Sequence, residues 1–160
     1  MPNWVRNIVY IENKQALKDL IVKKHDRDEF DFNKVIPMPE ELDESSDRFL
    51  EKLSIEEKLL FLKEHDGVDN WYDWRISNWD TKWNANETAI LDDNTVLFDT
   101  AWSPPFKIFS KISEMYNTTV EVRYADEGIT ENSGTIIYQD GAEMDYMEGD
   151  KEFCEEVWNT

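Results

Sequence analysis

One short segment limits the fold of this chain more than any other: residues 118–124 (TTVEVRY) alternate between polar and apolar side chains. Val120, Val122 and Tyr124 point to one side of an extended backbone, and the polar side chains between them point to the other. This alternation is typical of a strand with one face buried and one face in water. We therefore expect a sheet with one face covered.

The rest of the chain supplies further strands and the helices that cover them. Five more segments have the β-branched and aromatic content of strands and end at turn residues: 4–11, 30–36, 88–91, 95–100 and 134–138. Four segments repeat apolar residues at helical spacing: 14–24, 54–63, 106–116 and 151–158. Strands and helices do not alternate strictly, so we expect an α+β, ferredoxin-like arrangement: an antiparallel or mixed sheet with helices packed on one face.

Capping signals locate the helix ends. Asn13 is the expected N-cap of the first helix, and Ser54 with Glu57 forms a capping box at the second. Ser103 is the expected N-cap of the third helix, with Pro104 as its first residue. The second helix would bury an apolar face made of Leu59, Leu60 and Leu62.

With 160 residues, the chain has the size of one domain. We expect a single domain over residues 1–160, with a helical, Trp-rich insert at about 40–86 and an acidic C-terminal segment at 140–160. The one cysteine, Cys154, excludes an internal disulfide, and no apolar run is long enough for a signal peptide or a membrane span. These features predict a cytoplasmic protein with no membrane partner and leave its oligomeric state open.

The formal net charge is −19, from 36 acidic and 17 basic residues. Such a chain repels nucleic acids and attracts basic partners, so we expect no direct nucleic-acid binding and a partner protein with a basic surface. The alternative is that the charge only keeps the protein soluble. The acidic residues expected to meet a partner follow Pro39 and the last predicted strand: Glu40, Glu41, Asp43, Glu44, Glu143, Asp145, Glu148 and Asp150.

Four of the seven tryptophans fall within residues 71–83, mixed with charged side chains. Aromatic rings beside charges suit a cleft in which a ligand stacks and is oriented. The candidate ligand-binding residues are Trp71, Tyr72, Asp73, Trp74, Arg75, Trp79, Lys82, Trp83 and Trp102. The alternative is a structural cluster that packs the insert onto the sheet, with Arg75 paired to Asp73 or Asp80.

A second candidate site lies at residues 100–105, where a strand leads into a helix N-terminus that could hold an anion. An ordinary capped turn is the alternative. Enzyme motifs are missing from the sequence: it contains no GxSxG, P-loop, GxGxxG or HExxH pattern, and His25 and His65 lack a third residue at metal-ligand spacing. We expect no catalytic residues, no bound metal and no cofactor.

Four ordered blocks of the sequence resemble the YubB/Api-type ferredoxin-like proteins of phages and plasmids. Residues 1–7 (MPNWVRN) are similar to the Met-Pro-Asn-Trp-Cys-x-Asn start of that family, and the other blocks are residues 30–32 with 36–39, 71–83 and 98–105. The resemblance extends to about Gly128. Val5 replaces the family's cysteine, and Asp80 stands where a glycine is expected before Thr-Lys-Trp. The resemblance implies a ferredoxin-like fold, carriage on mobile elements and an unknown molecular function.

These features lead to two hypotheses about function. The first is a non-enzymatic interaction protein of a phage or mobile element, which binds and inhibits a host protein that handles nucleic acid in defence. The second is a small-ligand or nucleotide-binding module built on the Trp-rich segment, with Trp71, Trp74, Arg75, Lys82 and Trp83 at its centre. An enzyme is the least favoured class, because no acid–base or nucleophile set is present.

Overall fold

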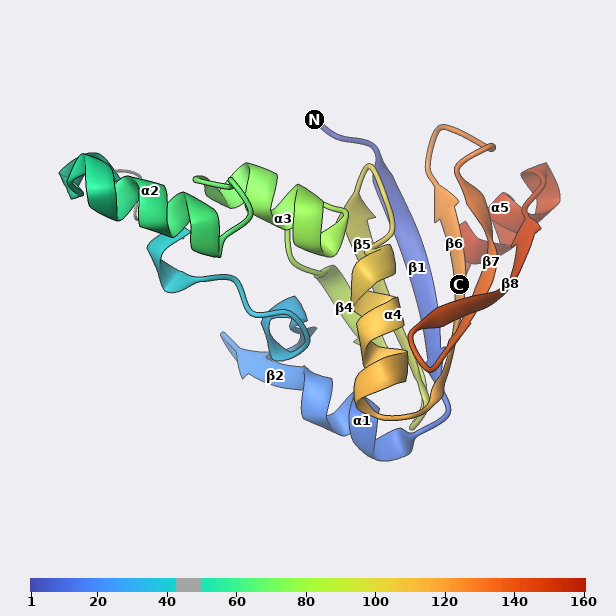
Figure 1. Cartoon of the computed structure of the whole chain (residues 1–160). Coiled ribbons are helices and arrows are strands. Elements are labelled where there is room, and N and C mark those ends of the chain that lie inside the picture. Colours follow the sequence, from blue (N-terminus) through green and yellow to red (C-terminus); the bar gives the residue numbers. More distant parts are fainter. Residues whose placement is uncertain (43–49) are drawn as a thin grey trace.

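The computed structural model of the chain describes residues 1–42 and 50–160. It is an α+β fold whose main sheet has six strands in the order β4-β5-β1-β6-β7-β8, with every neighbouring pair antiparallel (Figure 1). The strands are β1 (Trp4–Ile11), β4 (Asn86–Ile90), β5 (Thr95–Ala101), β6 (Thr119–Asp126), β7 (Ser133–Gln139) and β8 (Ala142–Glu148). The predicted fold class is confirmed.

The alternation of the strands divides the interior into two cores. On one face, Val9 of β1, Phe98 of β5 and Val122 of β6 belong to the main hydrophobic core. Helices α1 (Lys14–Leu20) and α4 (Phe106–Met115) pack on this face, and Phe109 and Ile112 of α4 are fully buried there. As expected, a capped helix follows β1: Asn13 accepts hydrogen bonds from two backbone amides of α1.

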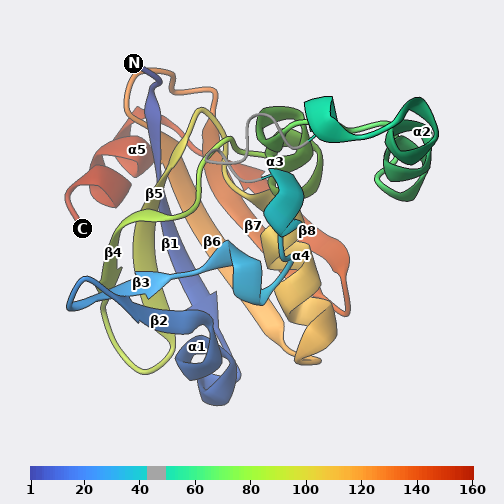
Figure 2. The same cartoon turned by 90° about the vertical axis from the view of Figure 1, so that its left-hand side faces the viewer.

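The opposite face of the sheet has a smaller core and a helix of its own. Ile8 of β1, Leu97 of β5 and Ala125 of β6 pack there against Val157 of α5 (Lys151–Trp158). Figure 2 shows α5 and α4 on opposite sides of the sheet. The helices therefore cover both faces, with α1 and α4 on the expected one and α5 on the other.

Two predicted elements near the N-terminus were wrong. The helix expected over 14–24 ends at Leu20, and Ile21–Lys24 forms β2, which pairs with β3 (Arg27–Phe30) in a separate two-stranded sheet. A turn at His25 and Asp26, both with positive φ, joins these strands. The strand expected over 30–36 ends at Phe30, because the Asp31 side chain caps a 3-10 helix, η1 (Phe32–Lys34).

Within its described residues, the insert includes the short 3-10 helices η2 (Glu40–Leu42) and η4 (Leu50–Lys52) and the helices α2 (Ile55–Glu64) and α3 (Trp71–Trp79). The capping box of Ser54 and Glu57 is confirmed. The apolar face predicted for α2 was wrong, because Leu59 and Leu60 are exposed and Phe61 is buried. Figure 1 shows why: α2 projects away from the sheet, which leaves most of its circumference in water.

Candidate functional site

The tryptophans of α3 divide into a buried pair and a half-buried remainder. Trp79 is fully buried and Trp74 nearly so, with their rings edge to face at 5.5 Å. The Trp79 indole donates to the carbonyl of Ile36 (2.9 Å), and its ring meets Phe32 edge to face. These two rings therefore anchor the insert to the main core, as the structural alternative expects.

The charged residues of α3 are engaged within the protein. The Arg75 guanidinium lies over the rings of Trp71 (4.9 Å) and Trp79 (5.4 Å) and donates to the carbonyl of Lys82 (3.2 Å). Asp73 accepts a hydrogen bond from the side chain of Asn70, the N-cap of α3. Trp71 is half-buried beside Arg75, and Tyr72 is the one aromatic residue of this helix that is exposed.

The other predicted ligand residues meet on the surface in a group that we call the tryptophan platform: Trp4, Lys82, Trp83 and Trp102. The Lys82 ammonium lies 3.9 Å from the centre of the Trp83 ring and 4.4 Å from that of Trp102. Trp4 packs against Trp83 with ring centres 5.9 Å apart. Sequence reasoning placed Trp4 in a strand but not in this group. The pairing of Trp4 with Ala101, beside Trp102, brings it there.

Trp102 is the exposed member of the platform and has a strained backbone. Its side chain is 45% exposed, and its φ of 65° lies in the left-handed region. A bulky residue held there costs about 1–3 kcal/mol. Hydrogen bonds hold this conformation: the Trp102 amide donates to the carbonyl of Asn3, and the Asn132 side chain donates to the carbonyl of Trp102. The strained backbone at Trp102 thus lowers the stability of the fold and places an indole ring in solvent.

The helix N-terminus proposed as an anion site is already occupied by the protein's own carboxylate. Asp80 accepts a hydrogen bond from the amide of Lys107 in the first turn of α4 (2.9 Å). The predicted cap was wrong as well: Pro105 is the N-cap of α4, and the Ser103 hydroxyl donates to the carbonyl of Pro104. Asp73 accepts from Asn70 and Asp80 from Lys107, and among the described residues no ion pair joins Arg75 to either carboxylate, so this predicted pairing was wrong.

Asp80 also explains a departure of the sequence from its family resemblance. It is the C-cap of α3 with a φ of 66°, a conformation that glycine adopts without strain. We expect Asp80→Ala to destabilise the protein by about 1–2 kcal/mol, because it loses both the tolerance for this conformation and the cap on α4. Asp80→Gly should cost less, since it loses only the cap. Urea unfolding followed by circular dichroism measures both, and equal stability of the alanine variant and the wild type would contradict this account.

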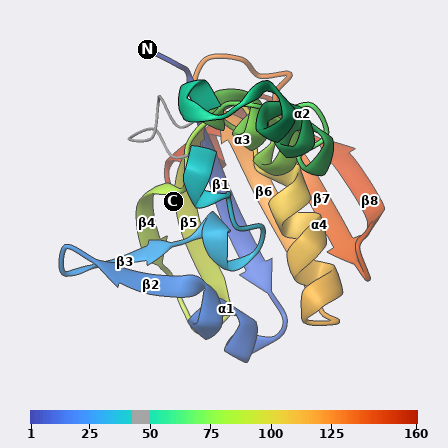
Figure 3. The same ribbon diagram turned by 60° about the vertical axis from the view of Figure 1, so that its left-hand side comes forward.

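The acidic candidates near the C-terminus lie on a strand that the sequence did not reveal. Glu143, Asp145 and Glu148 belong to β8, all of whose residues are exposed, at the edge of the sheet (Figure 3). Asp150, the fourth of this group, is the N-cap of α5 and accepts from the amide of Phe153 (2.8 Å). Sequence reasoning placed these residues after the last strand, and the structure places three of them within one.

The described residues of the second acidic group lie apart from the first group. Glu40 and Glu41 are exposed on η2, which lies with the insert on the other side of α4 from β8 (Figures 1 and 3). Asp43 and Glu44 lie outside the described residues. Among the described acidic candidates, Glu143, Asp145 and Glu148 therefore share one edge strand, and Glu40 and Glu41 lie apart from it.

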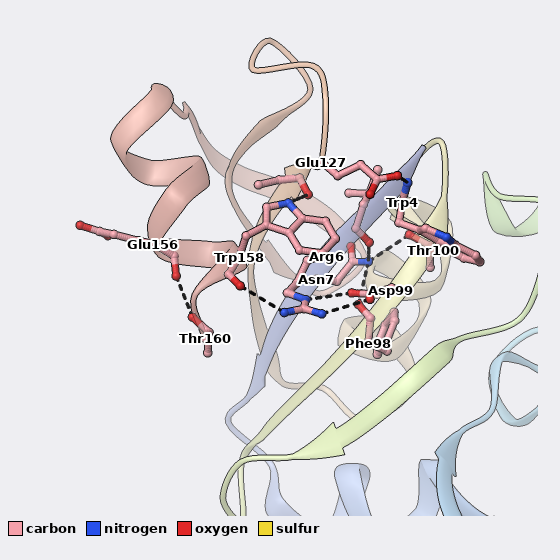
Figure 4. Close-up of polar contacts among 12 residues, drawn as sticks. Trp4, Arg6, Asn7, Phe98, Asp99, Thr100, Glu127, Glu156, Trp158 and Thr160 are labelled. Carbon is pink, nitrogen blue, oxygen red and sulfur yellow. Dashed lines mark hydrogen bonds and ion pairs between the residues drawn. The ribbon is translucent and has the colours of Figure 1, made fainter. Parts of the chain in front are cut away.

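A polar cluster on the α5 face was missed from the sequence (Figure 4). Arg6 binds Asp99 with two hydrogen bonds (3.0 and 3.2 Å) and lies 4.4 Å from the centre of the Trp158 ring. The Trp158 indole donates to the carbonyl of Ala125 (3.0 Å). Arg6 and Asp99 stand opposite each other in the pairing of β1 with β5. Because Trp158 of α5 contacts both Arg6 and Ala125, the cluster fixes α5 onto the sheet.

Beside this cluster, Asn7 is fully buried, and the two hydrogens of its side-chain NH₂ are shared among the carbonyls of Val5 and Phe98 and the hydroxyl of Thr100. These bonds tie β1 to the end of β5, directly before Trp102. The backbone that presents the tryptophan platform is therefore held from inside the sheet as well as from the surface.

Two buried tyrosines on the α4 face resist ionisation. Burial raises the pKa of both Tyr124 and Tyr138 well above its usual range; a hydrogen bond with Tyr146 adds to the shift at Tyr124, and the charge of Glu143 adds to it at Tyr138. Both phenols therefore stay protonated at neutral pH. Among the described residues, no three His, Cys, Asp or Glu side chains gather as they would around a metal ion.

No helix within residues 1–42 and 50–160 combines the length and the apolar character that crossing a membrane requires.

A family model described as a ferredoxin-like domain in Api92-like proteins matches residues 78–160. The matched region contains β4, β5, α4, β6, β7, β8 and α5, and it extends past Gly128 to the end of the chain. The central strand β1 comes from outside it, inserted between β5 and β6. Among solved structures, the Api92 protein of Yersinia pseudotuberculosis is similar, with 21% sequence identity and a TM-score of 0.43. The match covers 51% of this chain and 31% of that one. No curated protein matches the chain.

Proposed function

This chain belongs to the family of Api92-like proteins that contain a ferredoxin-like domain, and we propose that it is a non-enzymatic interaction protein of a phage or other mobile element. It binds a host protein with a basic surface and, by covering that surface, inhibits it. A basic surface of this kind is typical of proteins that handle nucleic acid, including those of host defence. The protein acts in the host cytoplasm.

One observation carries this proposal: the acidic edge strand β8. Its residues are all exposed, it forms the edge of the sheet, and it presents Glu143, Asp145 and Glu148. No ion pair within residues 1–42 and 50–160 involves any of these three carboxylates. Met144, Tyr146 and Met147 are exposed between them. Unpaired charge mixed with exposed apolar side chains is what a protein interface needs, since the first speeds encounter and the second slows dissociation.

Capture of a partner from host lysate, followed by kinetics with the purified pair, tests the proposal. Because attraction between a net charge of −19 and a basic surface acts at long range, the association rate should be high at low ionic strength and fall steeply as salt is added. An association rate that does not change with salt would contradict an acidic interface, whatever the identity of the partner.

Duplex DNA provides a second test, because the proposal assigns nucleic acid to the partner and not to this chain. We expect no shift of a DNA duplex in a mobility assay at physiological salt, since the field of the protein repels phosphate. Micromolar binding would mean that the local cations Arg75 and Lys82 outweigh the net charge. The proposal that the partner, and not this chain, binds nucleic acid would then be wrong.

The tryptophan platform favours a second candidate function, the binding of a small anionic ligand with a flat ring, such as a nucleotide. Lys82 offers a cation between two indole rings, and Trp102 presents an exposed ring on which a base can stack. A stacked base is worth about 1–3 kcal/mol. We therefore expect AMP to quench the tryptophan fluorescence of the wild type, and Trp102→Ala to weaken that binding about tenfold or more.

Trp71→Ala is the matched control, since Trp71 is half-buried beside Arg75 on α3 and is not one of the platform residues. If millimolar AMP leaves the fluorescence of the wild type unchanged, or if both variants bind it as the wild type does, the platform does not bind nucleotides.

A further inference from the structure

The free edge of β8 offers backbone hydrogen-bonding groups as well as charge. In the described chain, β8 pairs with β7 on one side only. The Gly149 amide donates to the carbonyl of Ser133 (3.1 Å), which makes these two residues a hydrogen-bonded pair of the antiparallel ladder. Such pairs alternate along the strands. Tyr146 and Glu148 therefore direct their own N–H and C=O groups away from β7, toward solvent.

β8 packs closely against β7, and this packing positions the outward groups. A Cβ atom at Gly134 of β7 would lie 2.6 Å from the carbonyl oxygen of Met147 and 3.1 Å from the ring of Tyr146. Only glycine permits this approach, and the Tyr146 ring covers it. The edge is thus a template for one more strand.

The side chains of β8 decide which strand fits. We propose that β8 binds an extended, basic segment of the partner protein by strand addition; this inference rests on the proposed function and specifies its geometry. In the register with β7, Glu143, Tyr146 and Glu148 share the face of Tyr138, Ile136 and Gly134, while Asp145 and Met147 share the other face. An added strand with Lys or Arg alternating with apolar residues places its cations opposite carboxylates.

A second copy of this chain fits poorly, because pairing two β8 strands would bring Glu143, Asp145 and Glu148 of each copy together. In the free protein, the Asp145 carboxylate accepts a hydrogen bond from the outward amide of Tyr146 (2.9 Å), so this amide is not open to a second copy of the chain. A backbone carbonyl of the incoming strand replaces the Asp145 carboxylate on this amide, which joins the amide to the added ladder. The charge that prevents self-association is thus the charge that selects the partner.

The test uses the wild-type protein and two fluorescent octapeptides of alternating lysine and valine. One is unmodified, and the other is N-methylated at its four central residues, which preserves its charge but blocks both of its hydrogen-bonding edges. In fluorescence anisotropy at low salt we expect the unmodified peptide to bind and the methylated one to bind about tenfold or more weakly. Equal binding of the two peptides would overturn strand addition and leave the acidic interface standing. No binding of either would overturn both.

Two variants at one position provide an independent readout. Glu148→Pro removes the backbone N–H of residue 148, which points away from β7 and makes no hydrogen bond to it. Glu148→Gln removes the same charge but keeps this N–H. We expect the proline variant to bind the unmodified peptide about fivefold more weakly than the glutamine variant, with matching circular dichroism spectra. Equal affinities of two folded variants would contradict a backbone bond at this residue.

Discussion

Replacing Trp79 with alanine is expected to destabilise the protein by about 3–5 kcal/mol, the range for a large aromatic side chain removed from a core. Trp79 is fully buried, its ring meets Trp74 and Phe32 edge to face, and its indole donates to the carbonyl of Ile36. The substitution opens a cavity where α3 meets η1 and the segment after it, and it leaves the part-buried carbonyl of Ile36 without its donor. Urea unfolding followed by circular dichroism gives the free energy of unfolding.

Tyr72→Ala is the matched control, because Tyr72 lies on the same helix with its ring 41% exposed. It should change the stability by less than about 0.5 kcal/mol. Trp79→Phe should fall between the two, since it keeps most of the packing and loses the hydrogen bond. A loss below about 1 kcal/mol for Trp79→Ala would mean that α3 does not depend on the core for its position.

Neutralising the acidic strand edge should slow association with the captured partner about tenfold or more at low salt. The variant combines Glu143→Gln, Asp145→Asn, Glu148→Gln and Asp150→Asn, which changes the net charge from −19 to −15. The two asparagines keep the hydrogen bonds of the carboxylates to Tyr146 and Phe153, so the fold and the cap of α5 are preserved. Any single substitution should be nearly silent, since one exposed charge contributes about 0–1 kcal/mol. Stopped-flow kinetics measures the rates.

A second fourfold variant separates position from net charge. Glu51→Gln, Glu56→Gln, Glu64→Gln and Asp66→Asn remove the same charge from exposed positions of the insert. We expect this control to associate at close to the wild-type rate. If both variants slow association equally, the partner responds to the net charge and β8 has no special place in the interface.

The elements that the sequence predicted correctly are those whose own residues carry the pattern. β6 alternates because Val120, Val122 and Tyr124 are buried and the side chains between them are not. The second helix was located by Ser54 and Glu57, because a capping box is a local interaction. Such features need no knowledge of distant residues.

The elements that the sequence missed depend on partners elsewhere in the chain. β8 has no apolar face, because an edge strand exposed on both sides gains its position from pairing with β7. The sequence pattern of the first helix continues through residues 21–24. These residues form the strand β2 because they pair with β3. The division of the tryptophans had the same origin. Trp4 joins the tryptophan platform because β1 pairs with β5, whereas the sequence alone does not distinguish the buried Trp79 from its neighbours.

Chemical-shift mapping by NMR with the unmodified lysine–valine octapeptide tests most directly whether β8 is the binding surface. We expect the backbone amide signals of Tyr146, Met147 and Glu148 to shift as the peptide is added at low salt, and the indole signal of Trp102 to stay in place. Added salt should reverse the change, because the attraction is screened. Shifts confined to Trp102 and Lys82 would move the binding surface to the tryptophan platform, and the absence of any shift would contradict an acidic interface.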